Sequence, residues 1–363
     1  MRRAPKVSPV MRAATAGRFF EDFTLGEKIA HATPRTLDNG DVALYQALYG
    51  GRHILNSSLP AARAAGYADR PLENWLVFHI VFGKTVPDIS RNAIANLGYA
   101  EGRFLAPVYC GDTLSAVSEV MGLRENSNGK SGIVMVRTRG LNQNHVPIVE
   151  YVRWVMVNKR DPSAPAPDPV MPHLADAVAP GDLVPPPENI AALDHTQSGS
   201  DRFFDDYAID SFIDHSDGVT LEDSEHMLAT RAYQNTARVH FDGLAQQNTR
   251  FGKRLIYGGH IISHARAMSF NGLENALSVA GLNAGTHAAP AFAGDTIYAG
   301  TRIVDKAVIA GVAGVGALRI RHFVTKNKTV GDIAARLADA DSGSGRPEEL
   351  LLDLDCWVWM ARG

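Results

Sequence analysis

The segment Phe19-Phe-Glu-Asp-Phe23 returns 184 residues later as Phe203-Phe-Asp-Asp-Tyr207. With that offset held and without gaps, nine positions between 19 and 50 carry the same residue in both copies, whereas average composition gives about two by chance. The match resumes downstream, where Gly111-Asp-Thr answers Gly294-Asp-Thr. The sequence therefore predicts a tandem repeat, in which each half of the chain adopts the same fold.

Each half is predicted to contain the same elements in the same order. A strand covers 27–35 in one half and 211–219 in the other, and a helix begins near Thr220, whose side chain would cap it. A long helix with little polar face follows at 72–86 and at 259–272, and such a helix is expected to be buried. Strand-like runs complete each half, at 93–105, 112–123, 131–141 and 146–158 and then at 277–289, 295–305, 313–325 and 350–360. Long strands after one buried helix predict an α+β fold, with an antiparallel sheet wrapped around the helix.

The chain divides into four segments. Residues 1–18 are basic, with no acidic residue before Glu21, and are expected to form a disordered tail. Residues 161–200 are rich in proline, which argues against a helix there and suggests a stiff spacer. The remaining segments, 19–160 and 201–363, are the two predicted domains.

Composition excludes several classes of function. The 363 residues are 45% hydrophobic and 21% charged, which is ordinary for a globular protein, and the net charge of -3 argues against general nucleic-acid binding. The two cysteines, Cys110 and Cys356, form neither a disulfide framework nor a metal-binding spacing, so we expect no metal site and a reducing, cytoplasmic setting. No apolar run reaches the length that spans a membrane, so no membrane partner is expected.

One stretch of the second half combines polar groups typical of an active site, Tyr233-Gln-Asn-Thr-Ala-Arg-Val-His-Phe-Asp242. An amide side chain, Asn235, precedes His240 by five residues, and the pair Gly258-Gly259 then opens an apolar run. Reactions that pass through an oxyanion need a base for proton transfer and donors for the negative oxygen. A histidine titrates near neutral pH, and a helix start presents free N–H groups. This stretch is therefore the candidate active site.

The pattern resembles the active-site segment of the MaoC-like, R-specific enoyl-CoA hydratases. Their motif is roughly Gly-Asp-x-Asn-Pro-Leu-His, followed by Phe-Gly-x-x-Ile-x-His-Gly at a helix start. Here His240 takes the position of the histidine, Gly258 that of the helix-start glycine, and Asn235 stands where the family has aspartate. The resemblance implies a double hot-dog fold, in which each half wraps an antiparallel sheet around a long central helix. It also implies a lyase without a cofactor that acts on a coenzyme A thioester.

At closer range the likeness is to a branch of that family that acts on a dicarboxylic thioester. It is carried by Gly17–Phe23, Leu76–Ile89, Tyr233–His240 and Tyr257–Ile262, and it runs from about residue 17 to the C-terminus. It implies reversible hydration of mesaconyl-CoA (2-methylfumaryl-CoA) to beta-methylmalyl-CoA, in glyoxylate assimilation or related C5-dicarboxylate metabolism. We also expect a homo-oligomer, specifically a dimer.

The two copies differ at the positions that carry chemistry. At the offset of 184, His240 meets Asn56 and Asn235 meets Gly51, so the first half lacks both groups. We therefore predict that catalysis belongs to the second half alone. The first half would be a degenerate copy, which in two-copy members of the family helps to accommodate the substrate. His53, in the degenerate loop, is expected to be structural or at the surface.

The predicted mechanism assigns a role to each group of the catalytic stretch. His240 activates the water, Asn235 holds the water or the substrate carboxylate because an amide cannot transfer protons, and Gly258 offers its N–H to the thioester oxygen. The second acid or base stays open between the substrate's own carboxylate, Glu225 and Asp242.

A dicarboxylic substrate also needs a cation. Arg238 is the first candidate, because arginine binds a carboxylate at two points, and Lys253 and Arg254 come next. Tyr257 and Gly259 are expected to contact the substrate.

Other functions remain open on the sequence alone. They are hydration of a different enoyl-CoA, non-catalytic binding of an acyl-CoA, and hydrolysis of the thioester. Loss of enoyl-thioester absorbance, measured beside release of free thiol, separates these possibilities.

Overall fold

The computed structural model describes residues 17–341 and 345–363, so most of the predicted basic tail, 1–16, lies outside the described residues. The first half consists, in chain order, of β1 (Lys28–Thr36), α1 (Asn39–Tyr49), α2 (Ile54–Ser57), α3 (Leu59–Ala64), α4 (Asn74–Thr85), β2 (Ala93–Phe104), β3 (Thr113–Glu125), β4 (Ser131–Leu141) and β5 (Pro147–Asn158). The second half consists of β6 (Phe212–Thr220), α5 (Asp223–Ala232), α6 (Arg238–Phe241), α7 (Gly243–Gln246), α8 (Gly258–Met268), β7 (Ala276–His287), β8 (Thr296–Ala307), β9 (Val315–Lys326), α9 (Val330–Asp341) and β10 (Leu350–Ala361).

The ten strands join one antiparallel sheet, in the order β1-β3-β4-β5-β2-β7-β10-β9-β8-β6. At its centre β2 pairs with β7, with Tyr99 opposite Gly285 and Arg103 opposite Gly281. The order of strands on one side of this pair repeats on the other side. The sheet therefore has an approximate twofold axis at the β2–β7 pairing, as the sequence repeat predicts.

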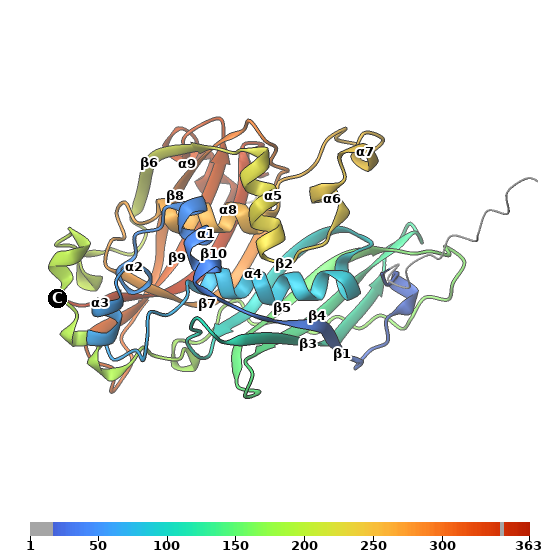
Figure 1. The fold of residues 1–363 in the computed structure, drawn as a ribbon. Coiled ribbons are helices and arrows are strands. Elements are labelled where there is room, and N and C mark those ends of the chain that lie inside the picture. Colours follow the sequence, from blue (N-terminus) through green and yellow to red (C-terminus); the bar gives the residue numbers. More distant parts are fainter. Residues whose placement is uncertain (1–16, 342–344) are drawn as a thin grey trace, which may run out of the picture.

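In each half one long, largely buried helix packs against the strands, α4 in the first half and α8 in the second (Figure 1). Every residue of α4 from Trp75 to Thr85 is buried, because this stretch offers almost no polar face. Both helices fall where the sequence predicts them, and so do the ten strands. The architecture is the predicted α+β double hot-dog fold.

The two halves meet through residues that are each other's counterparts in the repeat. The hydroxyls of Tyr49 and Tyr233 lie 2.7 Å apart, and Nε2 of His79 lies 3.1 Å from Oγ of Ser263. Both pairs are separated by 184 residues and both are buried. A residue can touch its own counterpart only close to a twofold axis, so these two pairs mark where the axis crosses the helical layer.

The proline-rich segment 161–200 packs on the sheet and does more than space the two halves. The indole N–H of Trp357 donates to the carbonyl of Val178 at 3.0 Å, and that of Trp359 donates to the carbonyl of Val184 at 3.1 Å. Four aliphatic side chains of the segment join the same buried cluster as these tryptophans, Val178, Leu183, Ile190 and Leu193. Its helical content is limited to 3-10 turns of three to five residues, in line with its proline content.

One predicted helix start is wrong, and the short helices α2, α3, α6 and α7 and the longer α9 were not predicted. Thr220 does not cap α5, because it is the last residue of β6 and its hydroxyl lies 2.9 Å from that of Thr296 on the neighbouring strand. The N-cap of α5 is Glu222, whose side chain makes no capping hydrogen bond. The helix α9 lies in the connection between β9 and β10, which no predicted element covered. Within the described ranges, no helix is long and apolar enough to cross a membrane.

Candidate active site

His240 lies on the single turn of α6, on an arm that extends from the end of α5 (Figure 1). Its Nδ1 lies 2.9 Å from the carbonyl oxygen of Leu255. Since a carbonyl can only accept, Nδ1 carries the proton and Nε2 presents a lone pair. Burial lowers the pKa of His240 to about 4, although the bond to Leu255 acts in the opposite direction. The imidazole is therefore neutral at pH 7, in the tautomer that a base requires.

Asn235 fixes the chain that leads to His240. It is 3% exposed, and its Oδ1 accepts a hydrogen bond from the backbone N–H of Ala237 at 3.0 Å, just before α6 begins. No partner of its Nδ2 group is found among the described residues, so the amide keeps two donors for a ligand. In the structure, Asn235 orients the turn before α6. The prediction that its amide holds water or the substrate carboxylate stays a prediction.

The helix α4 of the first half packs against the candidate loop that carries Asn235 and His240. A Cβ on Gly83 of α4 would lie 1.9 Å from the carbonyl oxygen of Tyr233, so only glycine lets the helix and the loop come this close. Beside it, Nζ of Lys84 donates to the carbonyl of Thr33 at 2.6 Å and to Oε1 of Gln234 at 3.1 Å. The active-site loop of one half therefore rests on the central helix of the other.

The start of α8 faces the histidine side of the site. The ring of Tyr257, its N-cap residue, lies 5.5 Å from the ring of His240. A Cβ on Gly258 would lie 2.3 Å from Cε1 of His287, so glycine is required here by the packing of an imidazole. The N–H groups in the first turn of a helix have no partner within the helix, and its dipole favours negative charge there. Gly258 and Gly259 stand at this position.

His226 is a site residue that sequence reasoning missed. Its Nε2 accepts the backbone N–H of Tyr257 at 2.8 Å, which leaves the proton on Nδ1. That Nδ1–H is buried and has no partner among the residues that the structure describes. The ring lies 5.7 Å from the ring of His240. Burial lowers the pKa of His226 to about 3, with the positive charge of a protonated His240 acting in the same direction, so His226 is a neutral donor.

The repeat contains a signal for these histidines. The counterpart of His226 is Val42 and the counterpart of His240 is Asn56. For His287, the last residue of β7, the counterpart at the end of β2 is Phe104. Three histidines of the second half therefore lie around the start of α8, and the first half has none at the equivalent positions. The sequence shows this asymmetry, but His260 and His264 share it, since their counterparts are Leu76 and Ile80. The asymmetry therefore marks the second half and does not single out His226 and His287.

Three other side chains that the sequence singles out already have partners within the chain. Arg254 pairs with Asp223, and Nζ of Lys253 lies over the ring of Phe292 at 4.1 Å from its centre. Oδ1 of Asp242 accepts the N–H of Ala245 at 2.9 Å, so this exposed carboxylate caps α7.

Two exposed side chains of the predicted set make no such contact. Neither Arg238 nor Glu225 has an ion pair or side-chain hydrogen bond with any residue in 17–341 or 345–363. Arg238 lies two residues from His240 on α6, so it is the free cation nearest in sequence to the candidate base.

In the first half, the equivalent positions do not form a second site of this kind. Gly51 has no side chain, and Nδ2 of Asn56 donates to the carbonyl of Pro71 at 3.1 Å. His53 is 2% exposed and packs edge-on against Phe270, so it is structural and not at the surface.

The chain is similar to known proteins over almost its whole length. The family profile described as mesaconyl-CoA hydratase matches residues 8–334. The chain is 56% identical to the mesaconyl-CoA hydratase of Cereibacter sphaeroides over 349 residues, 96% of this chain and 99% of that protein. It is 54% identical to the beta-methylmalyl-CoA dehydratase of Chloroflexus aurantiacus over 347 residues, 95% of this chain and 97% of that protein.

Solved structures show the same fold. A MaoC domain protein dehydratase from Chloroflexus aurantiacus superposes with a TM-score of 0.92 at 53% identity, covering 97% of this chain and all of that chain. A Mycobacterium tuberculosis protein with a double hotdog fold superposes with a TM-score of 0.72 at 23% identity, covering 96% of this chain and all of that chain.

Proposed function

The chain belongs to the mesaconyl-CoA hydratase family, and from this premise we propose how its residues perform the hydration. The reaction is that of a hydro-lyase on a coenzyme A thioester. In the forward direction, water adds across the double bond of mesaconyl-CoA. The hydroxyl goes to the carbon beside the free carboxylate, and a proton goes to the carbon beside the thioester carbonyl.

His240 acts as the base in this proposal. The observation that carries it is the hydrogen bond from Nδ1–H to the Leu255 carbonyl, which holds the imidazole in one tautomer with Nε2 free. Nε2 takes a proton from water as the water's oxygen bonds to the substrate carbon. The imidazolium that forms then gives a proton to the carbon beside the thioester carbonyl, which completes the addition and leaves His240 neutral again. Burial keeps the imidazole neutral beforehand, and the negative charge of the bound substrate favours the imidazolium that forms.

The N–H of Gly258 holds the enolate oxygen that develops at the thioester carbonyl. It belongs to the first turn of α8, where unpaired donors and the helix dipole both favour an anion. Tyr257 and Gly259 line the same turn and contact the acyl group. The Nδ1–H of His226 and the Nδ2–H groups of Asn235 are the remaining donors, and we assign them to the attacking water and to the substrate carboxylate.

One assay tests the function directly. Purified protein with mesaconyl-CoA should lose enoyl-thioester absorbance without releasing free thiol, and crotonyl-CoA should react more slowly. Release of thiol would instead indicate a thioesterase. Tight binding without a change in either signal would indicate a binding protein.

Arg238 is proposed to pair with the distal carboxylate. Arg238→Gln should then lower the preference for mesaconyl-CoA over crotonyl-CoA by about 10- to 100-fold, because a charge-assisted contact contributes roughly 1.5–3 kcal/mol. Arg238→Lys should recover only part of this, because lysine keeps the charge and loses the planar fork. The measurement is kcat/KM for both thioesters. An unchanged ratio would move the carboxylate site to Lys253 or Arg254.

Asn235→Asp probes which end of the substrate lies beside this residue. The substitution restores the carboxylate that the wider family carries. If the substrate carboxylate lies near Asn235, the new negative charge should repel it and lower kcat/KM for mesaconyl-CoA by several-fold or more. Crotonyl-CoA lacks that carboxylate and should lose less. Equal losses on both substrates would instead indicate damage to the turn that Asn235 makes with Ala237.

We also propose a cytoplasmic homodimer in which segments 19–160 and 201–363 are domains joined by 161–200. Both cysteines are free thiols, and Cys356 is buried, which suits a reducing compartment. Light scattering on the purified chain tests the dimer.

A further inference from the structure

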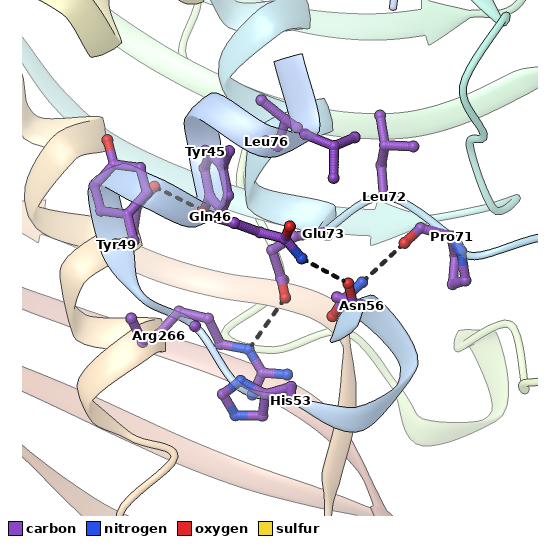
Figure 2. Close-up of a pocket in the computed structure, with 14 residues that line it drawn as sticks. Tyr45, Gln46, Tyr49, His53, Asn56, Pro71, Leu72, Glu73, Leu76 and Arg266 are labelled. Carbon is purple, nitrogen blue, oxygen red and sulfur yellow. Dashed lines mark hydrogen bonds and ion pairs between the residues drawn. The ribbon is translucent and has the colours of Figure 1, made fainter. Parts of the chain in front are cut away.

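A group of buried polar atoms without partners lines a pocket in the first half (Figure 2). The pocket lies at the counterpart of the active site. Asn56 stands where the second half has His240, Gly51 where it has Asn235, and Glu73 where it has Tyr257. Side chains of α1, α2, α4 and α8 form its walls, so both halves contribute to it.

Arg266 of α8 is the centre of this group. It is 2% exposed, its Nε and Nη1 have no hydrogen-bond partner among the described residues, and its Nη2 reaches the Leu277 carbonyl only at 3.5 Å. Oε2 of Glu73 lies 3.6 Å from Nε, within ion-pair range but beyond a hydrogen bond. Oε1 of Glu73 and Nε2 of His53 are also buried and unpartnered in the described part of the chain. Buried polar groups are seldom left unpaired, because each costs about 1–3 kcal/mol.

The dimensions of the pocket limit what can satisfy these groups. Measured for the centre of a water-sized sphere, the pocket offers about 40 Å³, which is room for roughly three water molecules. An outer pocket of about 320 Å³ on the same measure adjoins it, and the two share Asn56, Pro71 and Leu72. Together, the inner and outer pockets therefore fit a molecule with a small polar end group and a much larger remainder.

The pocket is separated from the active site. The hydroxyl of Tyr45 donates to Oγ of Ser263 at 2.9 Å, and the hydroxyls of Tyr49 and Tyr233 lie 2.7 Å apart. All four side chains are buried and fill the space at the twofold axis. One substrate molecule bound at His240 thus does not reach Arg266 through this wall, and the pocket needs a ligand of its own.

We propose that the first half holds a second, non-catalytic site for a coenzyme A thioester whose acyl group ends in a 2-hydroxycarboxylate. The carboxylate accepts from Nη1 of Arg266, while Nε of Arg266 stays turned toward Oε2 of Glu73. The adjacent hydroxyl of the ligand donates to Oε1 of Glu73. Without the hydroxyl, a carboxylate oxygen of the ligand would lie directly beside a carboxylate oxygen of Glu73, and the two negative charges would repel each other. The hydroxyl of the ligand lies between them and donates a hydrogen bond to Glu73. The outer pocket takes the thioester arm. This inference rests on the proposed function, since the product of that hydration has this end group.

Binding stoichiometry tests the proposal. In full-length His240→Ala protein, which should turn the product over at least ~100-fold more slowly, titration calorimetry with beta-methylmalyl-CoA should show two equivalents bound per chain. Mesaconyl-CoA lacks the hydroxyl and should bind the second site at least about tenfold more weakly, because a site built for a hydroxyl is left unpaired without it. One equivalent of beta-methylmalyl-CoA would mean that the pocket holds only water, and would overturn the inference.

Two variants locate the second equivalent. Arg266→Gln removes the cation, and Gly51→Leu adds bulk at a lining position where a Cβ would meet no atom within 4 Å, so the latter should fold without strain. Each should reduce binding to one equivalent. Gly181→Leu is the matched control, since a Cβ there also meets no atom within 4 Å and the residue lines neither pocket.

The two proposals fail in different ways. If Arg266→Gln and Gly51→Leu both keep two equivalents, the second site is elsewhere and this inference is wrong. If the unmodified protein hydrates mesaconyl-CoA but the His240→Ala protein binds one equivalent, only the proposed function stands. If two equivalents bind and the unmodified protein shows no hydration, only the second site stands.

Discussion

His240→Ala should lower kcat for mesaconyl-CoA by ~100-fold or more while the fold stays intact, because the variant loses the proposed general base. The structure supports an effect of this size. The imidazole is neutral, its tautomer is fixed by Leu255, and Nε2 is free to take a proton. Steady-state kinetics together with the circular dichroism spectrum and Tm of the variant make the test. Near-normal turnover in a folded variant would show that the site is elsewhere.

Asn56→Ala is the control for His240→Ala, because Asn56 occupies the same position in the other half. Among the residues that the structure describes, its amide bonds only to the Pro71 carbonyl, so its loss should change turnover far less. Equal losses at the two positions would contradict a single active site in the second half.

Lowering the pH from 7 to 5 should reduce the free energy of unfolding by roughly 10 kcal/mol, which is comparable to the whole stability of a typical domain. Five histidines have pKa values that burial lowers to between about 3 and about 4, and these are His79, His226, His240, His264 and His287. They stay neutral in the folded chain at pH 5, whereas an unfolded chain protonates them below about pH 6.5. Each should therefore favour unfolding by about 2 kcal/mol over this interval.

The stabilisation from these neutral histidines is complete above pH 6.5 and is lost as the pH falls toward the folded pKa values. Urea unfolding at intervals from pH 7.5 to 5 measures it, because each extra proton bound by the unfolded chain adds about 1.4 kcal/mol per pH unit to the slope. His264→Gln should reduce that slope by about one proton. A slope of less than one proton in the unmodified chain would contradict the buried, neutral cluster.

The repeat made most of the fold predictable. Nine identities between 19 and 50 predict two equal halves, and the alternation within each half predicts the strands. What the repeat could not supply is the way the halves meet. The contact between Tyr49 and Tyr233 depends on where the twofold axis crosses the helices, and no local pattern of residues encodes that position. The helix α9 was missed because it interrupts the second half only.

The site was predictable where chemistry and spacing coincide, as at His240 and Gly258. His226 was missed because a lone histidine on a helix that is otherwise unremarkable is usually structural, and its role becomes visible only through the bond from the Tyr257 N–H. Gly83 carries no chemistry of its own. Its importance follows from a close approach between the two halves, which a sequence does not display.

The pairing of β2 with β7 at the centre of the sheet has a consequence for how the two halves depend on each other. An isolated half would present one of these strands as a long unpaired edge, which is a template for pairing with any other copy. Holding both halves in one chain sets their effective concentration at a level that does not fall on dilution. The packed segment 161–200 raises it further by restricting where the second half can be. Because the partner is always present, the candidate loop that rests on Gly83 is supported even when the protein is scarce. The first half therefore serves as a scaffold without histidines of its own at the equivalent positions.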